Sequence, residues 1–254
     1  MDKQYSSKAT RTLRTTRLIV HTLYGVFIAG LIFPFIRERQ REIIISRWSK
    51  GLLAVMNIRL IARGILPDRN VMGTLFVGNH ISWIDIHALN SLRAVRFVAK
   101  SEVRDWPVFG WLAAKANTLF TEREKKQDAG RIVETITTSL KNSDCLCYFP
   151  EGTTTDGTEL KPFKRSLMQA AIDANTPIWP FSVSYPKANG EPNVEMAYYG
   201  DMSLLRSIQL ILMQQSPTVI LDFSLPINPK GHDRRGLAIM ARQAIASRLN
   251  FPES

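Results

Sequence analysis

The feature that most limits how this chain can fold is a long uncharged segment near its N-terminus. Residues 18–36 run LIVHTLYGVFIAGLIFPFI and contain no Asp, Glu, Lys or Arg. As a helix rising about 1.5 Å per residue, they are just long enough to cross the roughly 30 Å hydrocarbon core of a bilayer. The charged stretch RERQREIIISR follows, in place of the small-residue pattern of a cleaved signal peptide. We therefore expect a retained membrane segment.

A second apolar pattern follows directly. Ile44, Trp48, Leu52, Val55 and Met56 recur at helical spacing, with polar and basic residues elsewhere on the turn. A helix of this kind lies either at a lipid surface or against a soluble domain, and the pattern favours neither.

The charges beside the apolar segment favour a hairpin over a complete crossing. Residues 1–17 and 37–50 are both net positive, and basic flanks stay on the cytoplasmic side of a membrane. A spanning helix would carry one flank across. A segment that enters one leaflet and turns near Pro34 keeps both flanks at the anionic cytoplasmic surface. We expect residues 1–60 to form such a membrane-associated hairpin, with a single crossing by residues 18–36 as the alternative.

Residues 61–254 have the composition of a soluble α/β domain. Short apolar runs typical of buried strands alternate with stretches of helical periodicity. The predicted strands are residues 74–77, 96–99, 145–149, 178–184 and 218–223, and the predicted helices are residues 129–141, 166–174, 203–214 and 236–249. This alternation predicts an α/β fold with a mixed, mostly parallel sheet flanked by helices.

The formal net charge of +11 implies an anionic partner, such as nucleic acid, a phospholipid surface or a phosphorylated substrate. Many of the basic residues flank the apolar N-terminal segments, whereas nucleic-acid binding requires them to cluster with aromatic residues on one face. We therefore expect a phospholipid leaflet and no nucleic acid. Cys145 and Cys147 alternate within a predicted strand, without further cysteines or a His cluster. They are expected to be buried core residues and not metal ligands.

The first candidate for chemistry is NHISWID, residues 79–85, directly after the strand predicted at 74–77. A His at the end of a strand faces the mouth of an α/β domain, where such folds place active sites. His80 and Asp85 can meet only if His80 lies in a loop and a helix begins near Ser82. Asp85 would then accept the proton of one imidazole nitrogen and leave the other free as a base. The alternative is that Ser82 and Asp85 form only a capping box.

Further candidates follow other predicted strands. The turn PEGT, residues 150–153, follows the strand predicted at 145–149. Lys100, Arg123 and the pair Lys164 and Arg165 each follow or border a strand end, from which a cation can reach a phosphate in the same crevice. Taken singly, a turn or a solvated charge of this kind is equally typical of an ordinary surface.

Together these segments resemble the four sequence blocks of the glycerolipid acyltransferases, the family of 1-acyl-sn-glycerol-3-phosphate acyltransferase. The blocks are NH-x4-D at 79–85, F-x-x-R at 120–123, FPEGT at 149–153 and IWP at 178–180. They arrive in order within about residues 70–185. The third block of the family usually continues with Arg, whereas this chain has Thr154. Relatives that acylate lyso-ornithine lipid look similar at this position, with PEGTTT.

The resemblance implies roles for individual residues. His80 would be the general base of an O-acyltransferase and Asp85 its orienting partner. The implied substrate-binding residues are Lys100 and Arg123 at a phosphate, and Glu151, Gly152 and Thr153 at the acceptor pocket.

The implied reaction moves a fatty acyl chain from a thioester, either acyl-CoA or acyl carrier protein, to the sn-2 hydroxyl of lysophosphatidic acid, giving phosphatidic acid. The alternative acceptor is another lysolipid, such as lyso-ornithine lipid. Because the thioester is a co-substrate, no cofactor and no metal are expected. The enzyme is expected at the cytoplasmic (inner) membrane, with its active site facing the cytoplasm.

Overall fold

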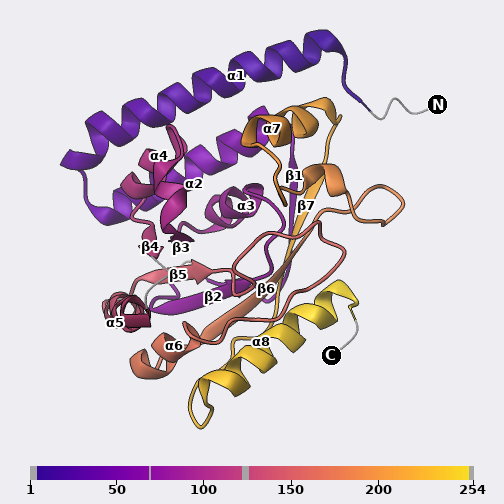
Figure 1. Cartoon of the computed structure of the whole chain (residues 1–254). Helices are drawn as coiled ribbons and strands as arrows, with labels where there is room; N and C mark the ends of the chain where they lie inside the picture. Colours follow the sequence, from indigo (N-terminus) through magenta and orange to yellow (C-terminus); the bar gives the residue numbers. More distant parts are fainter. Residues whose placement is uncertain (1–4, 69, 122–125, 252–254) are drawn as a thin grey trace.

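The computed structural model describes residues 5–68, 70–121 and 126–251, and it has one central sheet with helices on both faces (Figure 1). Seven strands lie in the order β1-β7-β6-β2-β5-β3-β4. Their bounds are Arg59–Gly64 (β1), Thr74–Gly78 (β2), Arg96–Lys100 (β3), Leu119–Thr121 (β4), Cys145–Tyr148 (β5), Ile178–Ser184 (β6) and Thr218–Phe223 (β7). The five strands predicted from apolar runs are therefore all present.

Neighbouring strands are parallel throughout the sheet except for β6 and β7, which are antiparallel. This confirms the prediction of a mixed, mostly parallel sheet. β2 is central and completely buried, with β5 on one side and β6 on the other. Because β2, β5, β3 and β6 run in the same direction, their carboxyl ends meet at one edge of the sheet. The predicted site residues follow these strand ends.

Helices cover both faces of the sheet. They are Lys8–Phe27 (α1), Glu38–Val55 (α2), Ile84–Leu92 (α3), Phe109–Lys115 (α4), Lys126–Lys141 (α5), Met168–Ala174 (α6), Leu204–Met213 (α7) and Arg234–Leu249 (α8). Figure 1 shows α1, α2, α3 and α7 on one side and α5, α6 and α8 on the other. The helices predicted in the α/β domain are α5 to α8, with ends that differ by a few residues.

Each face of the sheet has its own core because side chains alternate along the strands. Phe76 of β2 lies in the core below α2 and α3, whereas Leu75 and Val77 lie in the core against α5, α6 and α8. Cys145 and Cys147 are free thiols buried in the first of these cores, as predicted.

The N-terminal helices form the expected hairpin. α1 continues through a π-helical turn, Ile28–Ile32, and a 3₁₀ turn, Phe33–Phe35, before α2 begins. Trp48 of α2 stacks on His21 of α1 with ring centroids 4.8 Å apart, and its Nε1 donates to the His21 carbonyl over 3.1 Å. Gly25 permits this approach, since a Cβ there would lie 2.5 Å from Trp48 Nε1.

The hairpin packs against the α/β domain. Leu52 and Met56 belong to the core below the sheet, so α2 is the domain-packed helix of the two alternatives. β1 begins at Arg59, shortly after α2 ends at Val55, so the boundary predicted between residues 60 and 61 falls inside β1.

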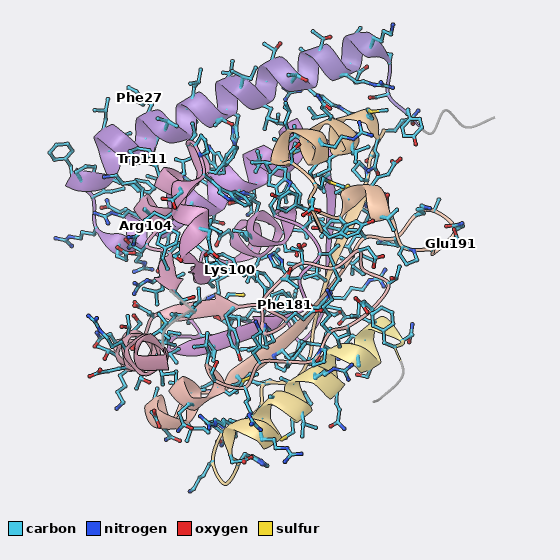
Figure 2. The ribbon with its side chains drawn as sticks, in the orientation of Figure 1. Phe27, Lys100, Arg104, Trp111, Phe181 and Glu191 are labelled. Carbon is cyan, nitrogen blue, oxygen red and sulfur yellow. The ribbon has the colours of Figure 1, made fainter. Side chains whose placement is uncertain are left out.

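The other face of α1 remains apolar and exposed. The continuous helical segment Lys8–Phe35 is long and apolar enough to cross a membrane, judged by its length and composition. Its exposed apolar side chains are Leu13, Ile19, Val20, Leu23, Tyr24, Phe27, Leu31, Ile32 and Phe35. Figure 2 shows Phe27 on the side of α1 that faces away from the sheet.

Candidate active site

The loop between β2 and α3 carries the first predicted block and is fixed to β6. The Asn79 amide donates to the Val183 carbonyl over 2.9 Å and accepts from the Val183 N–H over 2.7 Å. Gly78, which ends β2, lets the chain pass close to Phe181, because a Cβ at this position would lie 2.5 Å from its ring. These contacts set the position from which the next residue, His80, projects.

His80 and Asp85 meet across the start of α3. The His80 Nδ1 atom lies 2.8 Å from Asp85 Oδ2, and the Asp85 side chain is completely buried while that of His80 is 19% exposed. α3 begins at Ile84, so the helix start falls between the two residues as predicted. The geometry is that of an imidazole oriented by a carboxylate.

The Asp85 carboxylate also stabilises the loop. Its Oδ2 accepts from the backbone N–H of Ile81 and of Ser82 over 2.8 and 2.9 Å, and its Oδ1 accepts from the Tyr185 hydroxyl over 2.5 Å. The helix has no side-chain cap from its N-terminal residue. The capping contact and the His80 contact are therefore not alternatives, because one carboxylate makes both.

The His80 ring lies flat against an aromatic side chain. Its centroid is 3.9 Å from that of Phe149, with an interplanar angle of 5°. Because Asp85 Oδ2 already accepts from two backbone N–H groups, we treat it as an acceptor from His80 as well and assign the proton of this contact to Nδ1. The other imidazole nitrogen, Nε2, is then an acceptor that can act as a base.

Glu151 lies behind the main chain of His80. Its buried carboxylate accepts from the His80 N–H through Oε1 over 2.8 Å and from the Lys161 N–H through Oε2 over 2.9 Å. Burial raises the pKa of the Glu151 carboxyl, and these two N–H donors oppose that rise. The Thr155 N–H donates to the His80 carbonyl over 2.9 Å. The loop after β5 thus holds both main-chain polar groups of His80.

The remaining predicted residues occupy different positions around this edge. Gly152 has φ of +72°, which favours glycine in the turn after β5, and Thr153 is exposed. Lys100 is exposed at the end of β3, beside Thr121 of β4. In Figure 2 it lies between Arg104 and Phe181. Arg123 lies outside the residues that the structure describes.

An apolar cavity of about 180 Å³ lies beside the site. Its walls come from α1 and its π-helical turn, α2, α3, β3 and residues 103–118. Phe97 lines the cavity and stacks on Phe149, which in turn stacks on His80. His87, also in the wall, is kept neutral because burial lowers its pKa to about 4. The cavity offers an apolar chain a place that two stacked aromatic rings, Phe97 and Phe149, separate from the imidazole.

Sequence patterns did not single out several residues that build this site. Tyr185 contacts Asp85 and Thr155 contacts His80, both from segments far along the chain. A buried Tyr directly after a predicted strand carries no spacing signal that would connect it with Asp85.

Comparison with known proteins identifies the family. The sequence profile described as Acyltransferase matches residues 66–184. The lyso-ornithine lipid O-acyltransferase of Pseudomonas aeruginosa is 34% identical over 241 residues, covering 92% of this chain and 91% of that protein. The 1-acyl-sn-glycerol-3-phosphate acyltransferase of Neisseria gonorrhoeae is 30% identical over 224 residues, covering 88% of this chain and 86% of that protein.

A solved structure has a similar fold. The 1-acyl-sn-glycerophosphate acyltransferase of Thermotoga maritima has a TM-score of 0.64 and 22% sequence identity, covering 93% of this chain and 96% of that one. With this fold and the sequence relatives together, the chain belongs to the acyltransferase family, and the family predicted from the four blocks is confirmed.

Proposed function

We propose that this chain is a membrane-associated O-acyltransferase that moves a fatty acyl chain from a thioester to the free sn-2 hydroxyl of lysophosphatidic acid, giving phosphatidic acid. The observation that carries the proposal is the 2.8 Å contact between His80 Nδ1 and the buried Asp85 carboxylate, at the carboxyl edge of the sheet and beside an apolar cavity. The family membership supports the same reaction class.

In the proposed mechanism His80 is the general base. Its Nε2 takes the proton of the acceptor hydroxyl as the hydroxyl oxygen attacks the thioester carbonyl, a step in which general-base catalysis contributes roughly 10²- to 10⁴-fold. The Asp85 carboxylate stabilises the imidazolium that forms. The carbon–sulfur bond then breaks, and the departing thiolate, whose thiol has a pKa of about 8.5, recovers the proton from His80. The products are an ester and a free thiol, with no covalent enzyme intermediate.

The apolar cavity is proposed to hold the acyl chain during transfer. Its wall is largely apolar, which suits a fatty chain, and the neutral His87 adds no charge to it. We propose that the acyl chain enters between α2 and α4, since both helices contribute residues to the wall of the cavity. The thioester donor, acyl-CoA or acyl carrier protein, is a co-substrate in this scheme, and no cofactor or metal takes part.

The acceptor phosphate is proposed to bind Lys100 and Arg123, while Gly152 and Thr153 line the acceptor side. Lys100 is exposed at a strand end on the same edge as His80, which supports its part in this assignment. Lyso-ornithine lipid is the second candidate acceptor. The Pseudomonas relative supports it, as does Thr154, which stands where the third block of the family usually has the cation Arg.

The enzyme is proposed to lie at the cytoplasmic (inner) membrane with its site facing the cytoplasm. The exposed apolar face of α1 and the net positive charge on both flanks of the apolar segment support a hairpin that enters one leaflet. In that arrangement the hairpin places the cavity beside the leaflet that supplies the lysolipid.

A panel of lysolipid acceptors, assayed with acyl-CoA and with acyl carrier protein bearing the same chain, tests the proposal. Lysophosphatidic acid should be acylated, and Lys100→Ala should raise its KM by roughly 10- to 100-fold, the size of a lost charge-assisted hydrogen bond. Turnover of lyso-ornithine lipid alone, unaffected by Lys100→Ala, would establish the second candidate. Failure to acylate any lysolipid with either donor would refute the proposed function.

A further inference from the structure

A tyrosine outside the predicted site makes the shortest contact to the Asp85 carboxylate. Tyr185 follows β6 directly and is 3% exposed, and its hydroxyl donates to Asp85 Oδ1 over 2.5 Å. Burial and the neighbouring Asp85 charge raise the pKa of Tyr185 well above its ordinary value. The hydroxyl is therefore protonated, and so remains a donor, throughout the physiological pH range.

The two oxygens of the carboxylate have different partners. Oδ2 receives His80 Nδ1 together with the backbone N–H groups of Ile81 and Ser82. Oδ1 receives the Tyr185 hydroxyl, and Asp85 is completely buried. A buried carboxylate oxygen that loses a donor keeps the cost of its lost hydration. Removing the hydroxyl would therefore leave the plane of the carboxylate less firmly fixed and its charge less evenly shared.

Tyr185 is itself held by the chain around it. Its carbonyl accepts from the Asn193 N–H over 2.7 Å, and two residues earlier Val183 makes its paired hydrogen bonds with Asn79. The end of β6 thus holds the segment from Asn79 to Asp85 at two points. The Val183 main chain bonds the Asn79 side chain, and the Tyr185 hydroxyl bonds the Asp85 carboxylate. A side chain fixed in this way can orient the group that it touches.

We propose that Tyr185 is a positioning residue for the acyl transfer, holding the Asp85 carboxylate so that Oδ2 faces Nδ1 of His80. This inference rests on the proposed roles of His80 and Asp85. Tyr185 touches neither substrate in this scheme and acts through Asp85, so its loss should slow the chemical step without weakening substrate binding.

The test is Tyr185→Phe, which removes only the hydroxyl, with Tyr148→Phe as the matched control. Tyr148 is a buried tyrosine of β5 whose hydroxyl has no hydrogen-bond partner within the part of the chain that the structure describes. Tyr185→Phe should lower kcat by roughly 10- to 100-fold, as expected for a lost hydrogen bond to a charged group, and leave both KM values unchanged. Tyr148→Phe should leave kcat within about twofold of the wild type.

A double-mutant cycle separates positioning from packing. In an Asp85→Ala background, provided that circular dichroism shows a folded domain, Tyr185→Phe should cost almost nothing further, because its partner is already absent. An equal loss in both backgrounds would overturn the inference. An unchanged kcat in the single variant, or a loss confined to KM, would overturn it as well, and either result stands even if Asp85→Ala does not fold.

His80→Ala, measured beside these variants, distinguishes a failure of the inference about Tyr185 from a failure of the proposed mechanism. If His80→Ala is inactive while Tyr185→Phe turns over like the wild type, the inference about Tyr185 fails and the proposed mechanism stands. If His80→Ala retains turnover, the proposed mechanism itself is wrong, and the assignment of Tyr185 fails with it.

Discussion

The loop between β2 and α3, which carries His80, and the N-terminal hairpin are attached to the same sheet in different ways. Distant segments hold the loop by polar contacts: Glu151 and Thr155 bond the main chain of His80, and Val183 bonds the neighbouring Asn79. The hairpin also has polar contacts with the domain, such as those of Arg14 with the end of α7, but one long face of α1 presents large apolar side chains to the surroundings. The loop is organised as the interior of a soluble protein, whereas the hairpin has one face that suits an apolar solvent.

The difference in exposure indicates what each region meets. Phe27, at the end of α1, is 56% exposed, and Phe35, at the end of the 3₁₀ turn that follows, is 86% exposed, although both are large apolar residues. Continuous apolar surface of this extent marks a contact with lipid or with another protein. The inner face of the hairpin is closed by Trp48 and His21, so only the outer face requires such a partner.

The largest expected effect is confined to the catalytic loop. His80→Ala removes the proposed base, and activity should fall by at least about 10²- to 10⁴-fold, with binding to lipid vesicles unchanged. Turnover on detergent-dispersed substrate, circular dichroism and vesicle sedimentation measure the three properties on one sample. Near-normal turnover by a folded His80→Ala protein would remove the base from the mechanism.

The next effect should be confined to the hairpin. Leu23→Glu combined with Phe27→Glu places two charges on the exposed face of α1, and each apolar side chain withdrawn from lipid forfeits about 1.5–3 kcal/mol. Vesicle binding should weaken by roughly 100-fold or more, while turnover on detergent-dispersed lysolipid should persist.

Leu225→Glu combined with Ile239→Glu is the matched control. These two apolar side chains are also exposed, but they lie between β7 and α8 and on α8, on the other side of the sheet. Equal losses of vesicle binding in both double variants would mean that the hairpin has no special part in membrane association.

The sequence predicted the strands well where burial was complete and poorly at the margins of the sheet. The five predicted strands are rich in apolar residues, and their order along the chain indicated the carboxyl edge. β1 was missed because Arg59 and Arg63 bracket a short apolar run on a partly exposed edge strand. α1 begins at Lys8, well before the apolar segment, because Ser7 caps it and its basic first turns are still good helix formers.

The candidate site was predictable where a motif fixed the local geometry. His80 and Asp85 are five residues apart, so their meeting follows from a helix start between them. Tyr185 lies a hundred residues from Asp85, and no local pattern connects the two. Glu151 was expected at the acceptor pocket, and its place at a strand end followed from the sequence. The direction of its side chain, toward the main chain of His80, required the fold.

A moderate effect on turnover should follow when the loop that carries His80 loses a hydrogen-bond acceptor for its main chain. Glu151→Gln keeps the shape but replaces one acceptor oxygen with an amide that can only donate, so either the His80 N–H or the Lys161 N–H loses its partner. An unsatisfied buried group costs about 1–3 kcal/mol, and we expect kcat to fall roughly tenfold. Glu159→Gln, on an exposed carboxylate in the same loop, is the control. Equal rates for the two variants would mean that Glu151 does not position the loop.

The smallest effect on stability should appear where the hairpin joins the α/β domain. The Arg14 guanidinium of α1 donates to the carbonyls of Gln214 and Gln215 at the end of α7, over 2.6 and 2.8 Å. Arg14 is partly exposed, so we expect Arg14→Ala to cost only about 1 kcal/mol of unfolding free energy. That corresponds to a melting temperature lower by roughly 2–4 °C in a chain of this size, with faster hydrogen exchange at the end of α7.

Arg17→Ala, an exposed cation one turn further along α1, is the control for charge and should leave the melting temperature unchanged. If α1 left the domain to cross the bilayer, the contact of Arg14 with α7 would be lost in vesicles. Arg14→Ala would then change hydrogen exchange at the end of α7 in detergent but not in membranes. Protection that depends on Arg14 in both environments is the outcome expected of a hairpin that stays on the domain while its outer face enters one leaflet.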